Sequence, residues 1–153
     1  MAIAEDWTTV LRRYLPAAFG LHLAWEVVQL PLYTIWSDPV SKQAFAVLHC
    51  TAGDLMIAGL SLLVALALAA TPDWPRSGLR RVWVVLLILG VGYTIYSEWM
   101  NVNVRGNWAY APAMPTLPGI GTGLVPLLQW IVVPTATLWA AACTPPWRPT
   151  RSA

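Results

Sequence analysis

The chain has 153 residues, of which 58% are apolar and only 10% are charged, and ten are tryptophan. A soluble globular protein carries about 25% charged residues, and abundant tryptophan is typical of proteins anchored at membrane interfaces. Two cysteines exclude a disulfide scaffold. A net charge of +2 with scattered arginines excludes a nucleic-acid-binding surface. The composition therefore predicts an integral membrane protein.

Four stretches are long and apolar enough to cross a bilayer, which takes about 20 residues. They run from about 14 to 36, 43 to 70, 82 to 100 and 119 to 143. The residues before them are expected to form a short interfacial segment. The one long connection, 101–118, carries three prolines, and we expect it to lie on the bundle as a lid. With no internal repeat, the sequence predicts one all-α domain over residues 1–153, a bundle of four transmembrane helices.

The basic residues predict how these helices are oriented. Only Lys42 and Arg105 lie in the connections on one side of the predicted bundle. The positive-inside rule therefore places both termini in the cytoplasm, and we expect the protein in a bacterial inner membrane. The other seven basic residues share the opposite side: Arg12, Arg13, Arg76, Arg80, Arg81, Arg148 and Arg151.

Ionisable side chains at membrane depth are costly and usually mark function. His22, Glu26 and Gln29 are spaced to share one helix face. His49 and Asp54 are about 140° apart on an ideal helix, so one of them is expected to face a different neighbour. Counting about 1.5 Å per residue places the polar residues of all four segments in one layer, between the midplane and the outer surface. The sequence thus predicts a polar chamber there.

The first hypothesis for this chamber is acid–base catalysis on a lipophilic, isoprenoid- or sterol-like molecule. Burial favours the neutral forms of carboxyl and imidazole groups, so such a site can hold an acid and a base near pH 7. Glu26 and Asp54 are the expected acid–base pair, His22 orients or shares the proton of Glu26, and Glu98 is a further catalytic candidate. This set of side chains fits an isomerisation, a hydration or a cyclisation. The candidate substrate-binding residues are Gln29, Tyr93, Tyr96, Trp108, Tyr110 and Gln129.

A short motif resembles a known superfamily. His22 and Glu26, four residues apart, resemble the intramembrane histidine–glutamate pair of the emopamil-binding-protein sterol isomerases. The run Glu26-Val-Val-Gln-Leu-Pro-Leu-Tyr is similar to one in the related sigma-2 receptor family. The resemblance to this EXPERA superfamily covers about a dozen residues of one span. It implies four membrane helices around a ligand chamber, with His22 and Glu26 as proton donor and charge stabiliser.

Two other functions remain open from the sequence. His22, Glu26, His49 and Asp54 are plausible ligands for a divalent metal such as zinc, or carriers of protons, although acid–base catalysis itself requires no cofactor. Alternatively, small residues in the second span allow close contact with another helix, as in a non-catalytic assembly partner. Membrane lipids and a lipophilic small molecule are the expected partners, and a homo-oligomer is left open. Each polar residue also has a structural interpretation, as interhelical hydrogen bonds or an interfacial aromatic belt.

Overall fold

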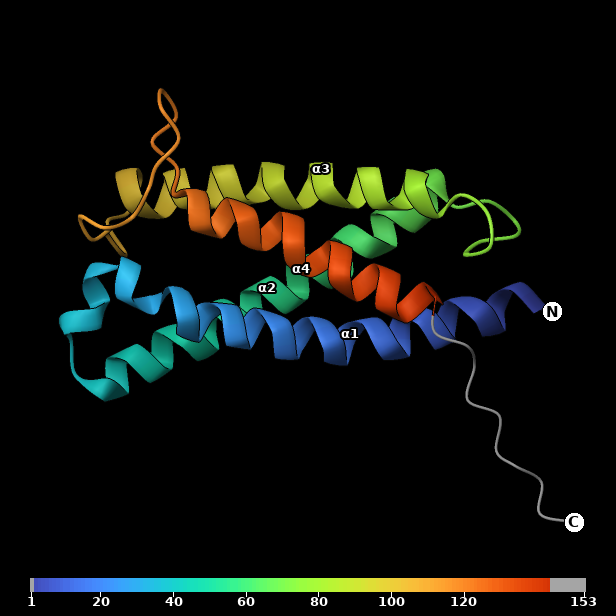
Figure 1. The fold of residues 1–153 in the computed structure, drawn as a ribbon, viewed down its shortest axis with the longest axis horizontal. Helices are drawn as coiled ribbons and strands as arrows, with labels where there is room; N and C mark the ends of the chain where they lie inside the picture. Colours follow the sequence, from blue (N-terminus) through green and yellow to red (C-terminus); the bar gives the residue numbers. More distant parts are fainter. Residues whose placement is uncertain (1, 144–153) are drawn as a thin grey trace, which may run out of the picture.

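Four long helices form a bundle, seen in a computed structural model that describes residues 2–143 and the side chains of residues 8–142 (Figure 1). Each helix packs against two neighbours, in the order α1, α2, α3, α4 and back to α1. No strand occurs within residues 2–143, which confirms the predicted all-α fold. The helices are α1 (Ala2–Gln29), α2 (Val40–Ala69), α3 (Leu79–Glu98) and α4 (Leu124–Cys143), with 3-10 helices η1 (Leu30–Leu32) and η2 (Thr34–Ser37) and a π-helical turn η3 (Trp99–Val104).

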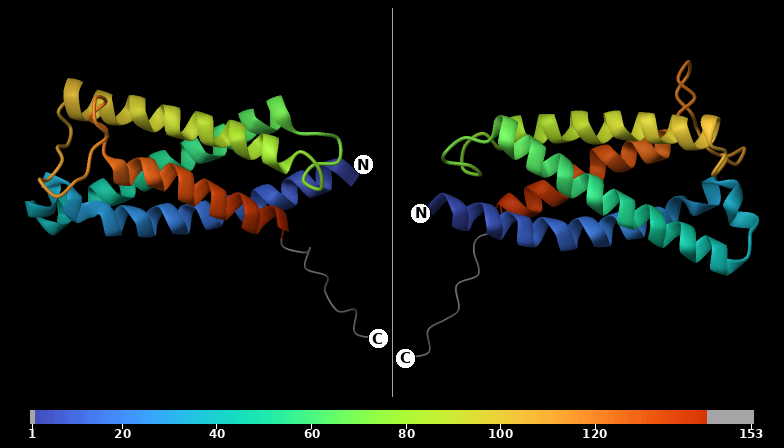
Figure 2. Two further views of the ribbon diagram at one scale, coloured as in Figure 1. Left: turned by 45° about the horizontal axis from the view of Figure 1, so that its top comes forward. Right: turned by 180° about the vertical axis from the view of Figure 1, so that it is seen from behind.

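The two ends of the bundle differ. The start of α1 and the end of α4 lie at one end, together with the α2–α3 connection (Figures 1 and 2). We call this the terminal end. The segments 30–39 and 105–123 lie at the opposite end, which we call the loop end. This antiparallel arrangement follows from the short α1–α2 and α2–α3 connections, which return the chain directly along its neighbour.

Three helices are long and apolar enough to cross a membrane: α2, α3 with its π-helical extension, and α4. The chain is therefore an integral membrane protein. α1 is not among these three, because its apolar residues are interrupted by Arg12, Arg13, His22 and Glu26.

Helix boundaries differ from the predicted spans in several places. The predicted first span runs to 36, but α1 ends at Gln29 and the chain continues in η1 and η2. The third helix continues as η3 to Val104, into the predicted 101–118 connection. α1 is helical from Ala2 onward, so the residues before 14 continue the first helix and do not form a separate segment. α4 begins at Leu124 instead of 119. Gly119 and Gly121 have φ angles of 83° and 73°, a left-handed conformation that cannot continue a right-handed helix.

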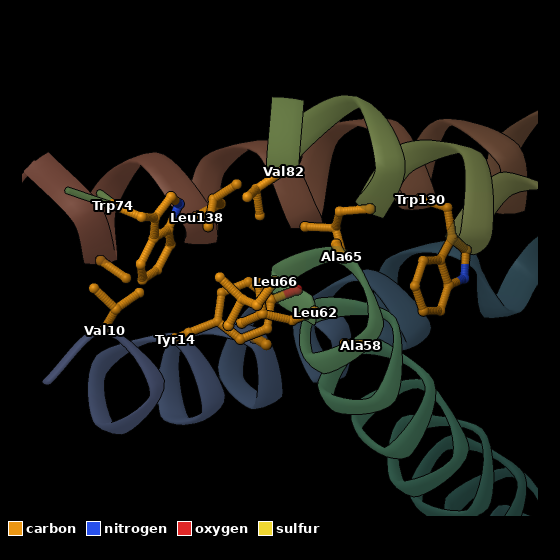
Figure 3. Close-up of a cluster of buried hydrophobic side chains, with 13 residues drawn as sticks. Val10, Tyr14, Ala58, Leu62, Ala65, Leu66, Trp74, Val82, Trp130 and Leu138 are labelled. Atoms are coloured by element: carbon orange, nitrogen blue, oxygen red, sulfur yellow. The ribbon is translucent and has the colours of Figure 1, made fainter. Parts of the chain in front are cut away.

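The apolar core occupies the terminal half of the bundle (Figure 3). Tyr14, Leu62 and Leu86 are completely buried there, on α1, α2 and α3. Trp74 and Trp130 lie at opposite ends of the cluster in Figure 3. Trp130, which is 3% exposed, is thus the last core side chain on the way to the loop end.

The missing side chain at Gly90 on α3 leaves room for the Trp130 ring. A Cβ built on Gly90 would overlap the six-membered part of the indole. By contrast, a Cβ on Gly92, two residues further along α3, meets nothing within 4 Å. The absence of a side chain at Gly90 therefore lets α3 and α4 approach closely around Trp130.

The Gly90→Ala substitution is expected to lower the free energy of unfolding by about 1–3 kcal/mol, because the added methyl group overpacks the α3–α4 contact. The measurement is equilibrium unfolding in mixed micelles. Gly92→Ala is the matched control on the same helix, expected to leave stability unchanged or slightly raised. Equal stability of the two variants would contradict the close packing of Trp130 on Gly90.

Candidate functional site

A cavity of about 820 Å³ lies in the loop-end half of the bundle. Side chains from all four helices and from the 105–123 segment line it, and Trp130 separates it from the apolar core. Most predicted site residues gather on its walls. Those that line it are Glu26, Gln29, His49, Asp54, Tyr93, Glu98, Trp108 and Gln129.

A hydrogen-bond network centred on Gln129 joins three helices at this cavity. The Gln129 Nε2 atom lies 2.9 Å from His22 Nδ1 and 3.1 Å from Glu26 Oε1. The same nitrogen lies 2.9 Å from Asp54 Oδ2. Gln29 Nε2 donates to Glu26 Oε1 at 2.8 Å and to Gln129 Oε1 at 3.3 Å. We call these five residues the Gln129 network; it brings Glu26 and Asp54 to the same donor nitrogen.

The Gln129 network contains more acceptors than its central amide can serve. An amide nitrogen carries two hydrogens, yet three candidate acceptors surround Gln129 Nε2. His22 Nδ1 also lies 3.4 Å from Asp54 Oδ2, so the imidazole can donate to that carboxylate. A neutral imidazole carries one N–H, and Gln29 Nε2 is a further donor to Glu26. The pairing within the network therefore depends on which ring nitrogen of His22 carries the proton.

His22 supports the network from behind the cavity wall. It is completely buried and is not among the residues that line the cavity. Its ring packs on Trp130 with 5.2 Å between centroids. Its Nε2 atom has no hydrogen-bond partner among the side chains of residues 8–142, so the polar contacts of the ring run through Nδ1. His22 is thus placed to orient Asp54 and Glu26 without touching a ligand.

A third carboxyl group, Glu98, is held at the loop end of the cavity. The Tyr110 hydroxyl donates to Glu98 Oε2 at 2.5 Å, and Tyr33 donates to the same oxygen at 3.5 Å. The Gly123 N–H donates to the Tyr110 hydroxyl at 2.9 Å. Burial, and then the adjacent Glu98, raise the pKa of Tyr110 above its ordinary value, so its hydroxyl remains a donor at neutral pH.

The predicted lid lies against the bundle. Its backbone pairs with the α1–α2 connection, where Thr34 N–H donates to the Ala109 carbonyl and Ala111 N–H donates to the Leu32 carbonyl, both at 2.9 Å. The rings of Tyr33 and Tyr110 pack with centroids 5.6 Å apart. These contacts fix the segment that brings Trp108 and Tyr110 to the site.

The cavity is closed on one side and open on the other. From α1 and α4, the lining residues Gln29 and Gln129 are buried. From α2 and α3, lining residues also reach the outer surface: Phe45 is 70% exposed and Tyr93 is 44% exposed. Figure 2 shows α2 and α3 diverging toward the loop end. The cavity therefore opens sideways between α2 and α3.

Tyr96 and His49 are among the predicted site residues that lie outside the Gln129 network. Tyr96 does not line the cavity; it is 54% exposed and packs beside Tyr93 and Trp99, as an aromatic belt would. His49 is exposed and stacks on Phe45 at the open side of the cavity. Within residues 2–143 no group of three or more His, Cys, Asp and Glu side chains could hold a metal ion. The four suggested zinc ligands are thus not brought together as one set.

Sequence reasoning missed two contributors. Tyr33 lies one turn beyond Gln29, a spacing that could have indicated it, but η1 separates it from α1. Trp130 follows Gln129 directly, and a tryptophan beside a glutamine on a membrane helix carries no signal that distinguishes a cavity wall from ordinary packing. Its contact with His22 depends on Gly90, which only the folded structure reveals.

The Gln129→Leu substitution is expected to destabilise the bundle by about 1–3 kcal/mol, because buried acceptors lose their shared donor. Combined with Asp54→Leu, the loss should be clearly less than additive, since the two residues belong to one network. Equilibrium unfolding in mixed micelles measures the free energy of unfolding of the single and double variants. Gln129→Leu combined with Tyr96→Leu is the control pair, expected to be additive within about 0.5 kcal/mol; additivity in both pairs would argue against a Gln129–Asp54 interaction.

The Tyr110→Phe substitution is expected to loosen the lid while keeping the ring contact with Tyr33. Loss of the hydroxyl removes the bond to Glu98 and leaves the Gly123 N–H without its acceptor. Amide hydrogen exchange at Gly123 should become about tenfold faster, as expected for one lost hydrogen bond. Tyr93→Phe is the control and should leave this exchange unchanged; an equal effect of both variants would contradict the role of the Tyr110 hydroxyl.

Comparison with models of protein families, with curated proteins and with solved structures finds no match to this chain. The function therefore has to be inferred from the site itself. Its defining features are two carboxyl groups sharing one amide donor, a third carboxyl held by tyrosines, and a cavity that opens sideways.

Proposed function

We propose that the protein is a membrane-embedded acid–base enzyme of the isomerase, hydratase or cyclase type, acting on a lipophilic isoprenoid- or sterol-like molecule. One observation carries the proposal: Glu26 and Asp54, from α1 and α2, accept hydrogen bonds from the same Gln129 amide at the wall of a cavity. Adjacent carboxyl groups removed from water favour a state in which the pair retains one proton. Such a pair supplies an acid and a base side by side.

The chemistry requires only proton transfers and, for hydration, water. Protonation of a double bond by one carboxyl group leaves a carbocation. Loss of a proton from a neighbouring carbon to the other carboxylate completes an isomerisation. Capture by water, with loss of the extra proton to the carboxylate, gives hydration, and attack by a second double bond followed by proton loss gives cyclisation. Glu98, on the same cavity, is a further proton acceptor.

The other residues of the site orient the carboxyl groups or contact the substrate. His22 is a positioning residue that holds Asp54 through Nδ1, whereas the resemblance of the His22–Glu26 pair to sterol isomerases implies a direct part for it in proton donation or charge stabilisation. Trp108, Tyr93 and Tyr110 supply aromatic faces near the cavity, which stabilise developing positive charge. Gln29 and Gln129 fix the orientation of the carboxyl groups.

The same proposal places α1 as the fourth transmembrane helix, with both termini on the cytoplasmic side of a bacterial inner membrane. The face of α1 opposite His22 is apolar and exposed, with Val27 at 55% and Val28 at 79%, as suits contact with lipid. The described basic residues near the terminal end outnumber those at the loop end, which supports this orientation. Arg148 and Arg151, which also entered the sequence argument, lie outside the described residues.

Proton binding or transport is the second candidate function. It is favoured by the meeting of an imidazole and two carboxyl groups around Gln129 Nε2, since each of these groups can bind and release a proton. A proton carrier would need no lipid in the cavity, so the identity of the bound molecule separates the two candidates. A metal-binding protein and a non-catalytic assembly partner, alone or as a homo-oligomer, are the remaining alternatives, and no contact within the described residues favours either.

Incubation with membrane lipid extract in D₂O tests the enzyme. An enzyme that protonates carbon places solvent deuterium on its product, where it no longer exchanges. We expect at least one lipid to gain deuterium in the presence of the purified protein in nanodiscs, detected by mass spectrometry. Glu26→Gln and Asp54→Asn should lower this incorporation by a factor of about 10² or more, the usual contribution of a general acid or base.

Two tryptophan variants provide matched controls. Gly53 lines the cavity, and a Cβ there meets nothing within 4 Å, so Gly53→Trp should fill the cavity and abolish incorporation without disturbing the fold. Gly92→Trp adds the same side chain at an exposed position outside the cavity. This variant should retain deuterium incorporation. Absence of deuterium from every lipid, or equal incorporation in the Glu26 and Asp54 variants, would overturn the enzymatic proposal.

A further inference from the structure

Both cationic side chains at the loop end line the cavity. Among the described residues, Arg12, Arg13, Arg76, Arg80 and Arg81 belong to the terminal half, and none of these five arginines lines it. Lys42 comes from the first turn of α2, and Arg105 follows η3. Two separate elements therefore bring positive charge to one place.

Lys42 and Arg105 are exposed and lie at the rim of the cavity. Lys42 pairs with Asp38 at 3.9 Å, but both side chains are largely exposed, at 67% and 45%, so this ion pair is weak and easily exchanged. Arg105 forms no ion pair within residues 8–142. Both cations are thus available to a negatively charged group at the rim.

Negative charge lies deeper in the same cavity. Glu26 and Asp54 belong to the Gln129 network, and Glu98 is 7% exposed. An anionic group is attracted to the rim and repelled by the carboxyl groups below it. The cavity therefore imposes one orientation on an anionic amphiphile: its head group at the rim and its hydrocarbon chain toward the carboxyl groups.

The walls suit a hydrocarbon chain in that orientation. Ile57 and Phe45 of α2 and Trp130 of α4 line the cavity, and its open side lies between α2 and α3. A chain can therefore pass the Gln129 network and leave the bundle sideways into the surrounding hydrocarbon, while the head group remains in water at the loop end.

We propose that the ligand is a lipid with an anionic head group, carboxylate or phosphate, bound by Lys42 and Arg105, and that the carboxyl groups act on its chain. This inference rests on the proposed function and specifies its substrate class. It assigns the proton transfers to a double bond in the chain, remote from the head group, which is consistent with a site whose reacting groups are carboxyl groups and not cations.

Three probes that share one C18 chain test the head group: oleate, oleyl alcohol and oleylamine. Binding to the purified protein in nonionic detergent is followed by tryptophan fluorescence, since Trp108 and Trp130 line the cavity. We expect oleate to bind about tenfold more tightly than oleyl alcohol, as charge-assisted hydrogen bonds are the stronger ones. Dodecyl phosphate against dodecanol then distinguishes a phosphate from a carboxylate preference.

Variants test whether Lys42 and Arg105 cause the preference for oleate. Lys42→Gln with Arg105→Gln should remove the preference for oleate, whereas Arg80→Gln with Arg81→Gln, exposed cations outside the cavity, should retain it. Gly53→Trp should abolish binding of all three probes. Loss of binding only in Gly53→Trp confirms that the probes occupy the cavity.

Three results would overturn the head-group assignment: equal affinity for oleate and oleyl alcohol, a preference for oleate that survives in the Lys42 and Arg105 double variant, or no binding of any probe. The first two leave the proposed acid–base function standing, because it depends on the carboxyl groups and on deuterium incorporation. Conversely, a preference for oleate with no deuterium incorporation into any lipid would retain the anionic ligand and reject the enzyme.

Discussion

The amide of Gln129 is the contact on which the arrangement of the bundle depends. Polar groups buried between membrane helices must find partners within the protein, since lipid offers none. One nitrogen on α4 lies within 3.1 Å of acceptors on α1 and α2. Rotation of α4 by one residue would turn this amide about 100° away and leave His22, Glu26 and Asp54 without their shared donor. The network therefore fixes the helix faces that form the cavity wall.

The bundle is divided along its length into two environments. The terminal half is apolar and closely packed, from Tyr14 to Trp130. The loop-end half holds the cavity, the Gln129 network and Glu98. Gly90 and Trp130 form the boundary, because the indole fits against α3 only where a side chain is missing. Close packing on one side of Trp130 supports His22 on the other, so that the rigid half of the bundle positions the polar groups of the open half.

The sequence predicted the layer of polar residues but not its details. Counting residues along each helix was enough to bring Glu26, Asp54 and Gln129 to the same level, because helical rise is constant. The angle between His49 and Asp54 predicted that only one would face the others, and the structure shows that it is Asp54. The exposure of Tyr96 depends on how far α3 rotates, which hydrophobicity leaves undetermined when all faces of a helix are apolar. Tyr33 reaches Glu98 through the path of η1, which no helical spacing describes.

In α1, the residues that form the polar site are the same ones that lower the hydropathy of the helix. His22, Glu26 and Gln29 reduce the hydropathy of this helix, so that it is not among the three that are apolar enough to cross a membrane by themselves. In the bundle the same residues face α4 and α2 and are hydrogen-bonded, while Phe19 and Val28 face outward. In the proposed arrangement with α1 in the membrane, the cost of burying these residues is offset by Gln129 and Asp54 on its neighbours. Formation of the polar site and packing of α1 are then one event, because the polar residues that lower the hydropathy of α1 also fix its position in the bundle.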